Sequence, residues 1–172
     1  MKCYLCNKAA KIKQQKGRAV CNQCFVRLIE KRIRKQTRLE KSFKPKDKIL
    51  VLGDVADYLV KSITKNMNIR IFSRKNKKIN KIVVEHTLDD ELNQFVKEIF
   101  QNKKHKKQGK TIKILKNITD KDIMLFAKIK GLRFKPNKKD KKFQDFLDQV
   151  QARYPNAKYN LLRNMEELRK IL

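Results

Sequence analysis

The chain has 172 residues, and its 46 Lys and Arg residues outnumber its 17 Asp and Glu residues, so the formal net charge is +29. No apolar run is long enough to span a bilayer and no signal peptide is present, so we expect a soluble, cytoplasmic protein with no membrane partner. The charge exceeds what solubility requires and indicates nucleic-acid binding, although a bias toward Lys-rich codons would explain part of it. With 40% hydrophobic residues, the chain can build one modest core.

All four cysteines lie in the first 24 residues, in two Cys-x-x-Cys pairs. Cys3 and Cys6 form one pair, Cys21 and Cys24 form the other, and fourteen residues separate the pairs. This separation is slightly shorter than the about 15–20 residues that separate the two pairs in zinc ribbons. Two such turns supply the four thiolates that Zn²⁺ prefers in a tetrahedron, and the neighbouring Lys and Arg residues favour the thiolate form. We therefore predict a structural zinc site.

Two other roles for these cysteines are less well supported. Disulfides belong to secreted proteins, and nothing marks this chain as secreted. A thioredoxin-like redox pair requires a strand-to-helix junction, and we expect neither pair to lie at one.

Residues 25–43 predict a basic amphipathic helix, because Phe25, Leu28, Ile29 and Ile33 recur at helical spacing. Its other faces carry the candidate phosphate contacts Arg27, Lys31, Arg32, Arg34, Lys35 and Arg38. The simpler interpretation is that these residues only form the solvent-exposed surface of the helix. The two interpretations are compatible.

Four apolar runs with helical patterns between them predict an α/β body. We expect strands at 48–54, 68–74, 81–85 and 111–115, and helices at 55–64, 91–100, 120–130, 143–153 and 160–172. Strand, turn, helix and strand in succession form a βαβ unit, which predicts a parallel sheet. We expect Asp54 to cap the helix at 55–64, and Thr87 with Asp90 to cap the helix at 91–100.

Two connections between these elements are basic. Residues 133–142 are expected to form a linker. The loop at 101–110 contains four further candidate phosphate contacts, Lys103, Lys104, Lys106 and Lys107.

The turn after the first predicted strand is poorly suited to a nucleotide. A phosphate cradle needs several glycines or small hydroxyl residues whose N–H groups converge, and only Gly53 qualifies here. Asp54 and Asp57 would repel a pyrophosphate. We therefore do not expect ATP to bind in the usual mode.

His86, Asp89 and Asp90 form a polar cluster at the end of a predicted strand. They are candidates for a remnant active site, but acidic groups in a first helical turn also compensate the helix dipole, and we favour that interpretation. Because the ribbon uses all four thiols, no cysteine remains for sulfur transfer or an iron–sulfur cluster.

Four segments, in order, resemble the cytosolic thiouridylase family, which makes 2-thiouridine at the wobble position of tRNA. They are the opening Cys-x-x-Cys…Cys-x-x-Cys-Phe through Phe25, KPKDKILVLGD at 44–54, His86–Glu91, and ILKNITDKDIMLFAKIKGLRFK at 114–135. The resemblance covers most of the chain. It implies a small parallel-sheet PP-loop domain of the adenine nucleotide alpha hydrolase-like type, with an N-terminal zinc ribbon and C-terminal helices. The expected boundaries are 1–40, 41–135 and 136–172.

The departures from this family are equally informative. Active members carry Ser-Gly-Gly-x-Asp-Ser where this chain has Leu-Gly-Asp-Val-Ala-Asp at 52–57. The cysteines of their PP-loop domain and the ligands of the second zinc site of some members are absent. The chain thus resembles the degenerate partner subunit of the eukaryotic heterodimer.

The resemblance implies a tRNA-binding, non-catalytic subunit that pairs with an active PP-loop thiolase or with itself. Two alternatives stay open. One is an active ATP-dependent tRNA sulfurtransferase with an atypical loop, which would use His86 and Asp89. The other is a general zinc-ribbon RNA-binding protein whose α/β body is a scaffold.

Overall fold

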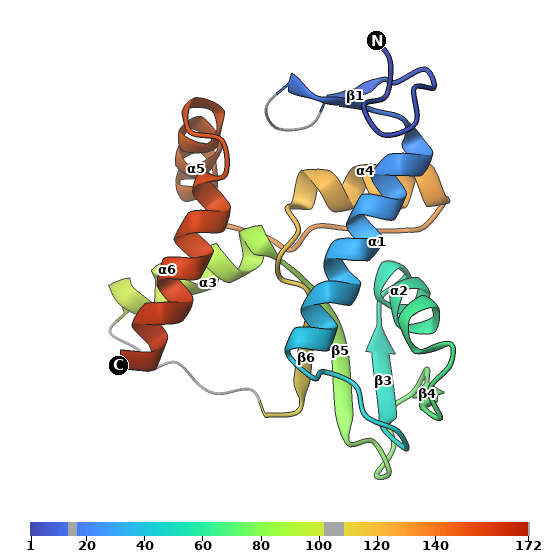
Figure 1. Cartoon of the computed structure of the whole chain (residues 1–172). Helices are drawn as coiled ribbons and strands as arrows, with labels where there is room; N and C mark the ends of the chain where they lie inside the picture. Colours follow the sequence, from blue (N-terminus) through green and yellow to red (C-terminus); the bar gives the residue numbers. More distant parts are fainter. Residues whose placement is uncertain (14–16, 102–108, 172) are drawn as a thin grey trace.

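The computed structural model describes residues 1–13, 17–101 and 109–171. Labelled as in Figure 1, its elements are β1 (Ile12–Lys13), β2 (Ala19–Val20), α1 (Asn22–Leu39), β3 (Lys48–Leu52), α2 (Asp54–Thr64), β4 (Arg70–Phe72), β5 (Lys81–Thr87), α3 (Leu88–Phe100), β6 (Thr111–Leu115), α4 (Asp120–Lys130), α5 (Lys141–Arg153) and α6 (Ala157–Ile171). Within these ranges, none of the helices combines the length and apolar character needed to cross a membrane.

The N-terminal residues form a small ribbon that runs directly into α1 (Figure 1). Strands β1 and β2 pair antiparallel, with Ile12 opposite Val20. Gly17 precedes β2 with φ 71°, a left-handed conformation that glycine adopts without steric cost. The ribbon therefore sits on the N-terminal end of the long basic helix.

Strands β3 to β6 form one parallel sheet in the order β4-β3-β5-β6. All four predicted strands are present, and the parallel direction predicted from the βαβ unit is confirmed. In the register of the sheet, Leu50 on β3 lies between Phe72 on β4 and Ile82 on β5. Because β3 and β5 are parallel neighbours, the turn after β3 lies beside the last residues of β5.

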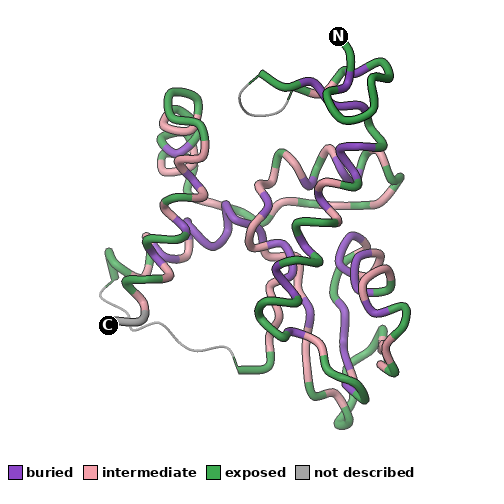
Figure 2. The backbone as a smooth tube through the Cα atoms, in the orientation of Figure 1, coloured by how far each residue is buried: buried purple, intermediate pink, exposed green. Residues whose placement is uncertain are grey.

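Helices α1, α2 and α4 share one hydrophobic core with the sheet. Phe25 and Ile33 of α1, Leu59 of α2 and Phe126 of α4 are fully buried in it. Buried positions also run along β3 in Figure 2. Three of the four cysteines are buried in the same cluster, so the ribbon is packed onto the body.

Helices α5 and α6 pack on α3 around a second cluster. Leu88, Leu92 and Phe95 of α3 contact a group that includes Leu147 of α5 and Met165 of α6. Figure 1 shows these three helices together beside the sheet. The C-terminal segment is therefore joined to the body through α3.

Several helices begin earlier than predicted, and α1, which begins at Asn22 rather than at residue 25, is one of them. Helix α3 begins at Leu88 rather than at residue 91, because Thr87 is itself the N-cap. Helix α6 begins at Ala157 rather than at residue 160.

Candidate functional site

The four cysteine sulfurs gather at one point between the ribbon and α1. All four Sγ atoms lie within 4.8 Å of one another, and Cys6 Sγ lies 3.6 Å from Cys21 Sγ. Four thiolates around one Zn²⁺ would be about 3.8 Å apart, given Zn–S bonds of about 2.3 Å. A cubane iron–sulfur cluster would require larger distances between the four cysteine sulfurs, because each thiolate binds a different iron. The site therefore fits a single tetrahedral ion.

Local structure brings each pair to this point. After Cys3 the chain turns tightly, with the Asn7 N–H donating to the Cys3 carbonyl at 2.9 Å and Asn7 itself at φ 57°. Cys21 is the N-cap of α1, and Cys24 lies in its first turn.

The position of Cys21 and Cys24 corrects one expectation. Because β2 ends at Val20 and α1 begins at Asn22, this pair does lie at a strand-to-helix junction. The geometry nevertheless disfavours a redox pair, because four sulfurs converge at this point rather than two.

The protonation of the cluster also favours a cation. Burial acts to raise the pKa of Cys3, but hydrogen bonds from the Cys21, Leu5 and Cys6 backbone outweigh it and lower the pKa to about 6. The Cys6 thiol, together with burial, raises the pKa of Cys24 to about 12. A bound metal ion would stabilise the thiolate form of Cys24 and offset this effect.

The turn after β3 contains a feature that the sequence reasoning missed. Glu85, on the neighbouring strand β5, directs its carboxylate to the first turn of α2, where Oε1 accepts the Ala56 N–H at 2.9 Å. Gly53 precedes the helix with φ 108°, and a Cβ there would overlap that carboxylate. The N-terminal end of α2 is therefore filled by an anionic group of the protein itself.

Asp54 does not cap α2 as predicted. It is the first helical residue, Gly53 is the N-cap, and Gly53 has no side chain with which to make a capping hydrogen bond. The Asp54 carboxylate instead accepts a hydrogen bond from Arg133 Nε at 2.7 Å, which lowers its pKa. Burial raises the pKa of Glu85, and the nearby Asp54 charge adds to that effect.

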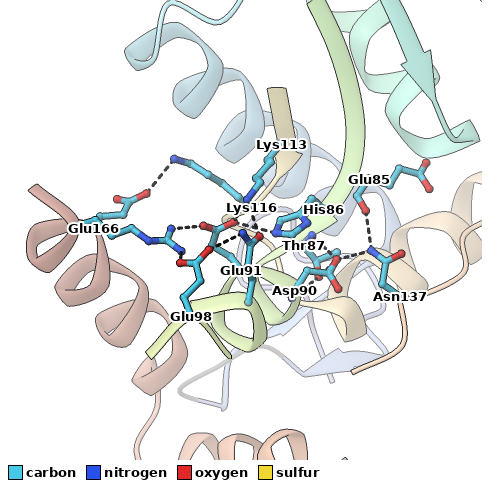
Figure 3. A network of polar contacts seen from close by, with 12 residues as sticks. Glu85, His86, Thr87, Asp90, Glu91, Glu98, Lys113, Lys116, Asn137 and Glu166 are labelled. Carbon is cyan, nitrogen blue, oxygen red and sulfur yellow. Dashed lines mark hydrogen bonds and ion pairs between the residues drawn. The ribbon is translucent and has the colours of Figure 1, made fainter. Parts of the chain in front are cut away.

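His86, Asp89 and Asp90 lie at the junction of β5 and α3, as predicted, and the capping interpretation is confirmed for Asp90. Its carboxylate accepts the Thr87 N–H at 2.9 Å, completing a capping box. Lys139 and Asn137 also contact this carboxylate, at 2.6 and 2.9 Å (Figure 3 shows Asn137). The predicted linker thus contributes buried contacts.

Asp89 is only 1% exposed and faces the C-terminal helices. Its Oδ2 accepts the backbone N–H of Asp120 at 2.7 Å. Its Oδ1 accepts hydrogen bonds from Lys158 at 2.5 Å and from Gln144 at 3.1 Å. The carboxylate is therefore enclosed and neutralised.

Glu91 was not singled out from the sequence as a site residue, yet it is the centre of a polar network (Figure 3). His86 Nε2 and Lys113 Nζ lie 2.9 and 2.7 Å from Glu91 Oε2. Arg169 of α6 pairs with the other oxygen. A run of three acids at the start of a helix was the available signal, but their lysine and arginine partners lie far away in the sequence.

The basic residues of α1 divide between two faces. Arg27, Lys31, Arg34, Lys35 and Arg38 line a groove of about 470 Å³ together with Glu30. Arg32 instead points toward α6, where Nη1 donates to Tyr159 Oη at 3.0 Å. Lys103, Lys104, Lys106 and Lys107 lie outside the described residues.

Comparisons with known proteins agree with this fold. No protein-family model matches the chain, and no curated protein matches it. Among solved structures, the chain is similar to a U34-tRNA thiolase, NcsA from Methanococcus maripaludis, determined with its [4Fe-4S] cluster. The TM-score is 0.77 at 18% identity, over 100% of this chain and 88% of that chain. The four-stranded parallel sheet, the N-terminal cysteine cluster and the C-terminal helices therefore have the PP-loop fold of that thiolase.

Proposed function

We propose that this protein is a non-catalytic, RNA-binding subunit for the 2-thiolation of the wobble uridine in tRNA. It would pair with an active PP-loop thiolase, or with a second copy of itself. The likeness to a U34-tRNA thiolase supports the role in thiolation. The net charge of +29 supports an RNA partner.

The observation that carries the non-catalytic role is the position of Glu85. The start of a helix is a natural anion site, because its free N–H groups and its dipole favour negative charge. Here the Glu85 carboxylate already accepts the Ala56 N–H, and it fills the space above Gly53. A nucleotide phosphate would have to displace this carboxylate and approach Asp54 and Asp57.

The acidic cluster at the start of α3 supports the same conclusion. Asp89, Asp90 and Glu91 are between 1% and 7% exposed. Lys158, Lys139 and Arg169, all from the C-terminal segment, neutralise one carboxylate each. Groups held in this way serve packing rather than proton transfer.

We assign structural zinc to Cys3, Cys6, Cys21 and Cys24. A bound zinc ion would fold a ribbon whose own core is small. Metal analysis of the purified protein should return about one zinc per chain, without the visible absorption of an iron–sulfur cluster.

A binding experiment tests the nucleotide-free role. Isothermal titration with Mg-ATP should give no saturable heat, and ATP should not raise the melting temperature. Robust pyrophosphate release by the isolated protein would refute the proposal and favour an active enzyme with an atypical loop.

A second experiment tests the RNA partner. Filter binding should show higher affinity for tRNA than for duplex DNA of equal length, falling steeply with salt. Affinity purification should recover tRNA together with either a Ser-Gly-Gly-x-Asp-Ser thiolase or a second, differently tagged copy of this chain. Equal affinity for tRNA, ribosomal RNA and duplex DNA, without either protein partner, would reduce the protein to a general nucleic-acid binder.

A further inference from the structure

A second hollow lies between α1 and α6, on a different face of α1 from the basic groove. It has a volume of about 410 Å³, and its lining includes Arg32 of α1, Asn117 of the turn after β6, and Asn156, Tyr159 and Arg163 at and within α6. Sites for small ligands typically enclose about 300–1,000 Å³. The cleft is therefore large enough for one planar ring with its attached phosphate.

The charge of the cleft suits an anion. Arg163 is exposed, and it makes no ion pair or hydrogen bond with any residue that the structure describes. Glu166 also lines the cleft, and Lys116, which Glu166 shares with Glu40, lies 3.0 Å from its carboxylate and offsets part of its charge. The guanidinium of Arg163 is free to make the bidentate contact that suits a phosphate.

Arg32 and Tyr159 lie against each other along one side of the cleft. The Arg32 guanidinium lies 5.3 Å from the centre of the Tyr159 ring and also donates to its hydroxyl. Unpaired bases stack on such aromatic rings and guanidinium planes, whatever their sequence. This pair offers an unpaired base a cationic and aromatic partner at one side of the cleft.

Two side-chain amides complete the cleft. Among the described residues, neither Asn117 nor Asn156 uses its side chain in a hydrogen bond. Each amide offers donors and an acceptor, as the Watson–Crick edge of a base requires. That edge is available only on an unpaired nucleotide.

We propose that this cleft holds one unpaired nucleotide of the bound RNA. The inference rests on the proposed RNA-binding function and names the part of the RNA that α6 would contact. The groove on α1 would bind backbone phosphates of paired and unpaired RNA alike, whereas the cleft discriminates in favour of unpaired loops.

The test compares two RNA probes on three variants of the full-length protein. The probes are a hairpin with an unpaired loop and a blunt duplex of the same stem sequence. Arg163→Ala and Asn117→Ala alter the cleft without removing a hydrogen bond or an ion pair among the described residues. Arg153→Ala, at the exposed end of α5, removes the same charge from a neighbouring helix and serves as the control.

Filter binding at one salt concentration provides the measurement. We expect Arg163→Ala to weaken binding of the hairpin about tenfold and Asn117→Ala to weaken it about fivefold. The affinity of each of these two variants for the duplex should lie within about twofold of the affinity of Arg153→Ala for the duplex. Equal losses on hairpin and duplex, or losses no larger than that of Arg153→Ala, would overturn the cleft assignment and leave the proposed function intact. If the unmodified protein binds neither hairpin nor tRNA, both proposals are wrong.

Discussion

Glu85 places its carboxylate against a helix rather than in solvent. The Ala56 N–H, one of the donors that α2 leaves unpaired at its start, donates to it at 2.9 Å. Burial raises the pKa of this carboxyl, so the charged form is held at some cost. We therefore expect the hydrogen bond from Ala56 to contribute more than the negative charge of Glu85 to the stability of the start of α2.

Replacing Glu85 separates these two contributions. Glu85→Ala leaves the Ala56 N–H without its partner and should lower the free energy of unfolding by about 1–2 kcal/mol. Glu85→Gln keeps an oxygen acceptor in the same place and should lose less than half as much. Urea denaturation at neutral pH measures both, and equal losses would show that the charge matters more than the hydrogen bond.

Glu91 provides the clearest pH dependence. Burial acts to raise its pKa, but hydrogen bonds with His86, Lys113 and Arg169 outweigh burial and hold the pKa well below the ordinary 4.5. A carboxyl whose pKa is lowered by folding stabilises the protein fully above its unfolded pKa. That stabilisation is lost as the pH falls below about 4.5 toward the folded value.

Glu91→Gln should therefore destabilise the protein at pH 7 by about 3 kcal/mol, because it leaves buried cations without their partner. The same change should flatten the loss of stability below pH 4.5 that the unmodified protein shows. Urea midpoints measured across this pH range provide the test. Asp57→Asn, which removes an exposed pair with Lys61, is the control and should change stability by less than about 1 kcal/mol. A loss for Glu91→Gln as small as that of the control would contradict the buried network.

At the scale of elements, the ribbon and α1 form a single unit. Cys21 is the N-cap of α1, and the buried residues Cys24, Phe25 and Ile29 follow it on the same face. The ribbon strands have only two residues each, so they contribute few hydrogen bonds of their own. The order of this unit therefore depends on the ion that we assign to the four thiolates.

Removing the metal should loosen this unit alone. After chelation, amide hydrogen exchange should speed up by at least about tenfold in the described ribbon residues and in the first turn of α1. Exchange in β3 and β5 within the same sample serves as the internal control and should change little. Uniform protection before and after removal of a bound ion would contradict the assigned role.

Local sequence patterns predicted the elements well, because each depends on neighbouring residues. The three-residue spacing between Thr87 and Asp90 predicted their capping box. The apolar runs in the sequence predicted all four strands of the large sheet. The prediction that Asp54 caps α2 was wrong, because the Asp54 carboxylate pairs with Arg133, which lies 79 residues away in the sequence.

The contacts of the site that the sequence did not predict also join residues far apart in the chain. Glu85 reaches Ala56 across 29 residues, and Lys158 reaches Asp89 across 69. Such contacts depend on the order of strands in the sheet and on the packing of α6 against α3. Neither the spacing nor the composition of the sequence carries that information.

At the scale of the whole molecule, the large positive charge is divided by the fold into different kinds of site. Some cations neutralise buried carboxylates, as Lys139 and Lys158 do. Others, including Lys31 and Lys35, are exposed along the groove of α1. Only the second kind is available to an RNA backbone, so location rather than net charge should determine RNA affinity.

Two double variants with equal charge test this distinction. Lys31→Gln with Lys35→Gln removes two cations from the α1 groove, whereas Lys75→Gln with Lys77→Gln removes two exposed cations from the connection between β4 and β5. If each groove lysine contacts one phosphate, the slope of log affinity for tRNA against log salt should fall by about 1.4–1.8 in the groove variant. The connection variant should change this slope by less than about 0.5, because a cation away from the RNA releases no counterion. Filter binding across a salt series measures both, and equal slopes would mean that the charge acts through the overall field of the protein rather than through α1.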